Sequence, residues 1–150
     1  MRTIKFRGKD IETGEWIYGH FFQRFGHYPV IVEPRPRYGK VMYCEIDVEG
    51  TTVGQFTGLT DKNGKEIYEG DILRGDEYPY NCDGVDNYFV EIVWADNVCG
   101  FYRITHKKPN STVRGISHGN WSELDEEDIK SFEVIGNIHD NPKLLKTETL

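Results

Sequence analysis

The chain has 150 residues, 37% of them hydrophobic and 29% charged, and its net charge is −7. This length suits one domain or two small ones and is long enough to bury a core. The negative charge argues against a protein whose whole surface binds nucleic acid, because phosphate contacts need Lys and Arg. No apolar run reaches the ~18 residues of a membrane span, and residues 1–7 lack the apolar region of a signal peptide, so we expect a cytoplasmic protein.

The first elements along the chain are expected to form a β-hairpin. Residues 4–7 alternate apolar and charged side chains, residues 8–14 supply a turn rich in glycine and charge, and residues 16–18 resume the alternation. Gly19 allows a bulge, after which residues 20–22 continue the same strand.

The next strand is expected at residues 28–33, and Pro34 and Pro36 should end it. The loop that follows is the most basic short stretch of the chain, and its candidate binding residues are Arg35, Arg37, Tyr38 and Lys40. This mixture of cations and an aromatic ring could contact a phosphate backbone or an acidic partner. Residues 41–48 form another alternating run that Glu49-Gly50 should end.

The central stretch of residues 53–73 contains the strongest local signals. Asn63-Gly64 predicts a turn with positive φ between the strands 55–59 and 65–73. A second sharp turn is expected at Glu69-Gly70-Asp71. There Gly70 can adopt the left-handed region and the Asp71 carboxylate can accept backbone N–H groups.

The second half adds further short elements. Strands are expected at residues 88–95, 101–104 and 132–138, loops at 74–87 and 106–120, and a short acidic helix near 123–130, with Ser122 and Asp125 as a capping box. The pattern indicates a mostly β fold, with an N-terminal β-hairpin region over residues 1–66 and an SH3-like small barrel over 67–142. Residues 143–150 are expected to be a tail.

Several motifs that could indicate a phosphate-binding or metal-binding site fail on their spacing. The glycines of residues 58–66 fail the phosphate-loop pattern because five residues separate them and Glu66 follows the Lys. The histidines show no metal-binding pair, and Cys44, Cys82 and Cys99 suit reduced thiols better than a disulfide framework. We therefore expect no enzymatic activity and no cofactor, and we assign no catalytic, cofactor-binding or metal-binding residue.

A weaker alternative is a metal-dependent hydrolase. Asp128 and Lys130 have the spacing that metal-dependent nucleases use, and Glu91 on an earlier strand could supply the second carboxylate. An acidic helix start followed by a compensating Lys explains the same residues.

The charge is distributed unevenly. Residues 1–40 carry 8 Lys and Arg against 4 Asp and Glu, a net charge of +4, whereas residues 41–150 carry 10 against 21, a net charge of −11. This segregation either reflects chance placement of solvated charges or provides a basic face for an acidic face of another subunit or partner.

Four segments resemble the YopX family of phage and prophage proteins: residues 4–7, 14–19, 53–72 and 134–142. The resemblance implies a small β-rich protein with an N-terminal region that self-associates, a C-terminal SH3-like barrel and no established activity. It implies structural roles for Phe6, Trp16, Tyr18, Gly19, Gly54, Thr57, Gly58, Asp61, Asn63, Gly64, Tyr68, Glu69, Gly70 and Asp71. We expect a homo-oligomeric accessory protein that acts by binding in a bacterial host. The alternatives are a nucleic-acid-associated factor that uses the basic loop, or the hydrolase.

Overall fold

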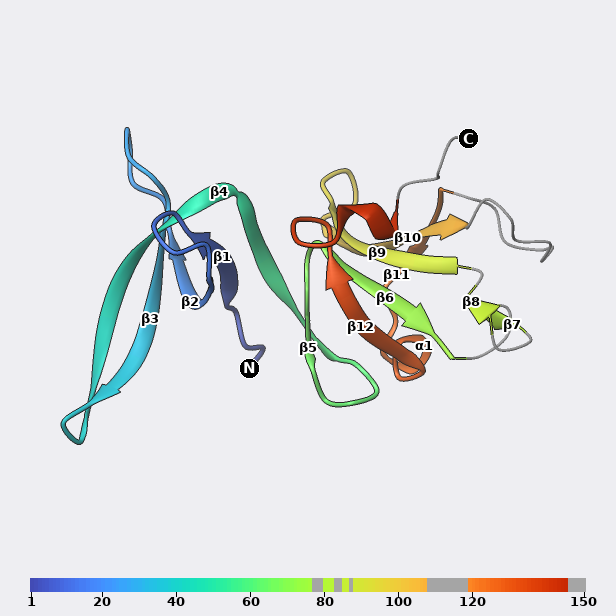
Figure 1. Cartoon of the computed structure of the whole chain (residues 1–150), viewed down its shortest axis with the longest axis horizontal. Helices are drawn as coiled ribbons and strands as arrows, with labels where there is room; N and C mark the ends of the chain where they lie inside the picture. Colours follow the sequence, from blue (N-terminus) through green and yellow to red (C-terminus); the bar gives the residue numbers. More distant parts are fainter. Residues whose placement is uncertain (77–79, 83–84, 87, 108–118, 146–150) are drawn as a thin grey trace. The chain divides into compact units, whose positions relative to one another are not determined.

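The computed structural model describes residues 1–76, 80–82, 85–86, 88–107 and 119–145. The chain divides into two compact units, Met1–Gly58 (unit 1) and Leu59–Leu150 (unit 2), and both are built mainly of antiparallel strands (Figure 1). The sequence places the boundary at residue 66, whereas the units divide between Gly58 and Leu59. Residues 146–150 of the expected tail lie outside the described residues.

Unit 1 is a ring of four strands. They are β1 (Phe6–Asp10), β2 (Trp16–Phe22), β3 (Val30–Arg37) and β4 (Lys40–Thr60), of which Leu59 and Thr60 belong to unit 2. Each strand pairs with the next, and β4 pairs back with β1. The expected first hairpin is confirmed, and β2 continues past Gly19 to Phe22.

The core of unit 1 lies inside this ring. Ile17, Ile31 and Val48 are buried there, with Phe6 packed against them. Gly19 is required by close packing, because a Cβ at this position would lie 2.0 Å from the Val32 carbonyl oxygen.

Two of the motif aromatic residues of unit 1 lie outside its core. Trp16 is half-buried, and the guanidinium of Arg7 lies 4.6 Å from its ring centroid. Tyr18 is 41% exposed.

Strand β4 contradicts the expectation that Glu49-Gly50 ends a strand, since β4 runs through both residues. The pairing of β1 with β4 shifts register between Arg7 and Lys9, so the extra residues of β4 form an irregularity and not a turn. Thr52 holds this irregularity together. Its hydroxyl donates to the Glu49 carbonyl at 2.6 Å and accepts from the Lys9 backbone N–H at 2.8 Å.

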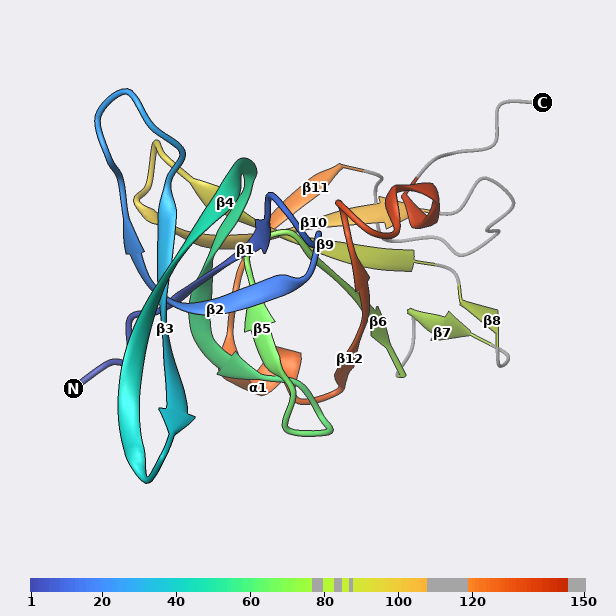
Figure 2. The same cartoon turned by 60° about the vertical axis from the view of Figure 1, so that its left-hand side comes forward.

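Unit 2 is a curved antiparallel sheet with the strand order β11-β10-β9-β6-β12 (Figure 2). Its elements are β5 (Glu66–Tyr68), β6 (Asp71–Gly75), β7 (Asn81–Cys82), β8 (Val85–Asp86), β9 (Tyr88–Ala95), β10 (Gly100–Lys107), β11 (Asn120–Glu123), α1 (Glu126–Ile129), β12 (Phe132–Asn137) and the 3₁₀ helix η1 (Pro142–Leu144). β5 pairs with β4, and β7 pairs with β8. The expected mostly β fold with a small barrel is confirmed.

The core of unit 2 combines residues of β5, β6, β9, α1 and β12. It is formed by Ile67, Leu73, Val90, Ile92, Ile129, Phe132 and Val134. Trp94 lies outside this core, because it is 37% exposed and packs edge-on against Phe101 near the end of β9. The helix cap also differs from the expectation. Asp125 accepts the Glu127 N–H at 2.7 Å, whereas Ser122 lies in β11 opposite Arg103.

The turn at residues 61–64 is confirmed and is tied to a distant strand. Gly64 has φ +79° and donates to the Asp61 carbonyl at 3.0 Å. The buried Asp61 carboxylate accepts the N–H groups of Asn63 and Lys65 at 2.8 and 2.9 Å, and that of Val134 in β12 at 3.0 Å. These bonds join the hairpin to β12, which explains why the hairpin belongs to unit 2.

The second turn of the central stretch also agrees with the sequence. Gly70 has φ +86°, and Asp71 accepts the Tyr68 N–H at 2.8 Å. Of the other motif residues there, Gly54 is buried, Thr57 and Glu69 are half-buried, and Gly58 has φ +91°. The stretch therefore acts as scaffold.

Candidate functional site

The four candidate binding residues come together on a β-hairpin and not on a loop. β3 runs through both prolines to Arg37, and its pairing with β4 continues to the Arg37–Lys40 pair. We call residues 34–43 the arm. All of them are exposed, and Figure 1 shows the hairpin extending past β1 and β2. The expectation that Pro34 and Pro36 end the strand is therefore wrong.

A two-residue turn closes the arm. Tyr38 has φ +49° and Gly39 has φ +72°, and two consecutive residues with positive φ are typical of a type I′ turn. This turn fixes the register of the two strands. It also places the Tyr38 side chain, which is 96% exposed, at the tip.

The position of the prolines in the pairing explains why the strand tolerates them. In a two-residue hairpin the closing pair is hydrogen-bonded, and hydrogen-bonded pairs then alternate with non-bonded pairs. Because Arg37 and Lys40 close the turn, the pairs that contain Pro34 and Pro36 are non-bonded. Both proline nitrogens therefore face the outer edge of β3, where the pairing with β2 has already ended at Val32. No ladder bond is lost.

The arm has one basic and one apolar face. Cross-strand partners lie on the same face of a hairpin, and successive pairs alternate between the two faces. Arg35, Arg37, Lys40 and Met42 lie on the basic face, and Pro34, Pro36, Val41 and Tyr43 lie on the apolar face. Val41 is 61% and Tyr43 68% exposed. The sequence alone does not separate these two faces.

Only part of the positive charge on the arm is available to a partner. The Arg35 Nε donates to the Glu33 carboxylate at 2.5 Å, and this hydrogen bond raises the pKa of Arg35. Within the part of the chain that the structure describes, Arg37 and Lys40 form no ion pair. The arm tip therefore carries two unneutralised cations beside Tyr38.

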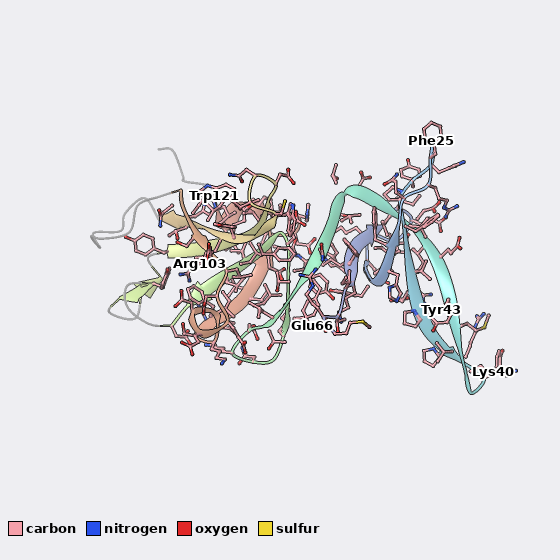
Figure 3. All side chains as sticks on the ribbon, turned by 180° about the vertical axis from the view of Figure 1, so that it is seen from behind. Phe25, Lys40, Tyr43, Glu66, Arg103 and Trp121 are labelled. Carbon is pink, nitrogen blue, oxygen red and sulfur yellow. The ribbon has the colours of Figure 1, made fainter. Side chains whose placement is uncertain are left out.

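The opposite end of β3 carries an aromatic loop that sequence reasoning missed. Phe22, Phe25 and Tyr28 are 59%, 102% and 54% exposed. A hollow of about 440 Å³ beside this loop is lined by Arg24, Gly26, His27, Tyr28, Pro29 and Asp47. Figure 3 shows Phe25 and Lys40 at opposite ends of unit 1. In the sequence, the closely spaced Phe residues before Gly26 are the signal that could have indicated this aromatic loop.

Unit 2 has a hollow of about 490 Å³ that is lined by Tyr80, Arg103, Glu127, Asp128, Lys130, Ser131 and Phe132. Arg103 donates to Asp128 at 2.7 Å, and its guanidinium lies 5.7 Å from the Phe132 ring centroid. Its side chain is 12% exposed. Sequence reasoning missed Arg103 because the residue looks like the solvent-facing position of an alternating strand. The ion pair with Arg103 gives Asp128 a structural role.

The structure does not bring Glu91 together with Asp128. The Glu91 carboxylate lies 2.9 Å from His106, and both side chains are 19% exposed. Glu91 pairs with Ile104, whereas Arg103, the partner of Asp128, pairs with Ile92 on the opposite face of the sheet. Among the described residues, no three His, Cys, Asp or Glu side chains are placed to hold a metal ion.

None of the described helices is both long and apolar enough to cross a membrane.

The model of the family described as "YopX protein" matches residues 5–146. The crystal structure of protein EF1440 from Enterococcus faecalis is similar, with 26% sequence identity and a TM-score of 0.58 over 97% of this chain and 100% of that chain. The comparison with curated proteins finds no match. The resemblance of the sequence motifs is therefore confirmed, and the chain belongs to the YopX family.

Proposed function

We propose that the protein is a non-enzymatic accessory protein of a phage or prophage, that it acts by binding in the bacterial cytoplasm, and that unit 1 joins copies of the chain. The family supports the phage context. The observation that carries the binding role is the arm, whose apolar face exposes Val41 and Tyr43 at 61% and 68%. Contiguous apolar surface of this kind marks interaction sites on soluble proteins.

The charge distribution supports contact between copies. The cations of Arg37 and Lys40 lie at the arm tip, while residues 59–150 carry 10 Lys and Arg against 18 Asp and Glu, a net charge of −8. Complementary charges of this kind steer association and fix its register. A basic tip on one copy therefore suits the acidic unit 2 of another.

Light scattering on the full chain over a range of concentrations tests this proposal. We expect a mass above that of one chain, and we expect the double variant Val41→Ser, Tyr43→Ser to lower that mass. Val98→Ser is the matched control, because Val98 is 51% exposed in unit 2 and lies outside the arm. A single-chain mass at every concentration would rule out self-association.

A second candidate function is nucleic-acid binding by the arm tip. The supporting observation is that Arg37, Tyr38 and Lys40 lie at the end of a two-stranded ribbon, a shape that the major groove of DNA admits. This function requires retention of the chain on DNA or RNA that weakens with salt and is lost on Arg35→Gln, Arg37→Gln, Lys40→Gln. No retention at low salt would exclude it.

A further inference from the structure

The two edges of the arm differ in the hydrogen-bonding groups that they present. On the β3 side, the residues whose backbone groups face outward include Pro34 and Pro36, which have no N–H to donate. On the β4 side, the same alternation turns the N–H and C=O groups of Val41, Tyr43 and Glu45 outward. One edge is therefore depleted of donors, and the other has both donors and acceptors.

No described strand covers the β4 edge of the arm. The pairing of β1 with β4 reaches only to the Asp10–Val48 pair, and the Ile11 N–H donates to the Asp47 carbonyl at 3.2 Å just beyond it. From Asp47 towards the tip, β4 has only β3 beside it among the described strands. Residues 41–45 thus form an edge strand in which every residue except Cys44 is exposed, and which includes the β-branched Val41 and the aromatic Tyr43.

We propose that this edge of β4, at residues 41–45, binds an extended segment of a partner protein as an added β-strand, and that this segment alternates acidic and apolar residues. The inference rests on the proposed binding role of the arm and names the chemistry of the partner. Main-chain hydrogen bonds supply the affinity in strand addition, and alternate side chains supply the specificity.

The faces of the arm determine this alternation. Side chains of an added strand lie alternately over the basic face, beside Lys40 and Met42, and over the apolar face, beside Val41 and Tyr43. Carboxylates on the first set reach the unpaired cations of Arg37 and Lys40. Apolar groups on the second set pack on the Tyr43 ring. A duplex nucleic acid would match the cations but would leave the apolar face exposed, so the observations favour a peptide.

The test measures fluorescence anisotropy of a labelled, capped peptide in which Glu alternates with Val, titrated with the full chain. The matched peptide replaces each Glu with Lys. We expect binding of the Glu peptide that weakens with salt, and no binding of the Lys peptide. Equal binding of the two peptides, or displacement of the Glu peptide by a DNA duplex, would overturn the proposal.

Proline substitution separates the backbone contact from the side-chain contact. Val41→Pro removes the outward N–H at a non-bonded pair, as Pro36 does across the hairpin, so the arm keeps its ladder. We expect Val41→Pro to weaken peptide binding about tenfold relative to Val41→Ser, which keeps the N–H. Equal affinity of these two variants would contradict strand addition.

A gain-of-binding variant tests the asymmetry of the two edges. Pro34→Val with Pro36→Val restores outward N–H groups on β3. We expect the number of bound peptides per chain to rise from one to two. An unchanged stoichiometry would show that the prolines do not protect that edge.

Light scattering on the same samples separates this proposal from self-association. Peptide binding by a chain that stays monomeric supports strand addition and refutes self-association. Loss of self-association in Val41→Pro, with no peptide binding in any variant, overturns the peptide partner, because the edge then pairs with a second copy.

Discussion

Two hairpins of the same chain show what a turn can and cannot specify. The turn at residues 61–64 and the turn at the arm tip both depend on a glycine with positive φ, at Gly64 and Gly39. The first is joined to β12 through the buried Asp61 carboxylate. The second is held by its own ladder, with no buried partner among the described residues, and residues 34–43 around it are all exposed. Local turn chemistry sets the shape of a hairpin, and a buried polar partner makes it part of the scaffold.

The largest effect is expected from a substitution in the hairpin that contains the turn at residues 61–64, which we call the scaffold hairpin. Asp61→Ala removes the acceptor of three backbone N–H groups, one of them the buried Val134 N–H. We expect a loss of about 3 kcal/mol in the free energy of unfolding, because bonds to a carboxylate are strong and the donor left behind is buried. Urea unfolding measures this loss. Asp10→Ala is the control, because Asp10 accepts its N–H groups in an exposed turn. Equal effects of the two variants would contradict the anchoring role.

A matched glycine pair sharpens the comparison. Gly64→Ala and Gly39→Ala each place a Cβ in the left-handed region without a steric contact, at a local cost of about 1–2 kcal/mol. We expect Gly64→Ala to lower the midpoint of global unfolding. Gly39→Ala should speed amide hydrogen exchange in the arm while leaving that midpoint unchanged, since the arm opens locally. A similar midpoint shift in both variants would mean that the arm unfolds with the rest of unit 1.

The two hairpins should also differ at alkaline pH. The hydrogen bond to Asp76 raises the pKa of Lys62, which belongs to the scaffold hairpin. A raised folded-state pKa contributes stability that is complete below the unfolded-state value and is lost as pH rises through the folded-state value. Thermal unfolding should therefore show an alkaline loss of stability that is smaller in Lys62→Met. The arm has no counterpart, because the Arg35 guanidinium keeps its proton over this range.

The smallest expected effect concerns the exposed ion pair of the arm. Arg35→Gln removes the contact with Glu33 but should leave the free energy of unfolding nearly unchanged, because exposed ion pairs contribute little. Urea unfolding of this variant checks this expectation. A loss comparable to that of Asp61→Ala would show that the arm contributes to the scaffold.

The sequence predicts those elements that local residue preferences determine. It fails for those elements that depend on which strands pair and in which register. β9 matches the expected strand 88–95, and the turns at Gly64 and Gly70 form where their residues favour positive φ. The sequence predicts a loop at residues 34–40, whereas the structure forms a hairpin there, because the effect of a proline depends on which strand edge its nitrogen faces. That edge is known only once the register is known.

The candidate binding surface is also only partly predictable from the sequence, because part of it is local and part of it depends on strand pairing. Arg35, Arg37, Tyr38 and Lys40 are neighbours along the chain, so they stay together in any fold. The apolar face opposite them requires cross-strand pairing, and the Arg103–Asp128 contact joins residues 25 positions apart. Neither feature has a signal in the order of the residues.

The proline edge of the arm limits how far strands can accumulate on this protein. A ribbon that could accept strands on both edges would offer a template for continuous growth into a fibril. Because Pro34 and Pro36 leave the β3 edge without donors at two successive outward positions, a strand can be added only on the side of β4. The arm is therefore a terminus of any sheet that includes it, which allows an exposed β-ribbon without polymerisation.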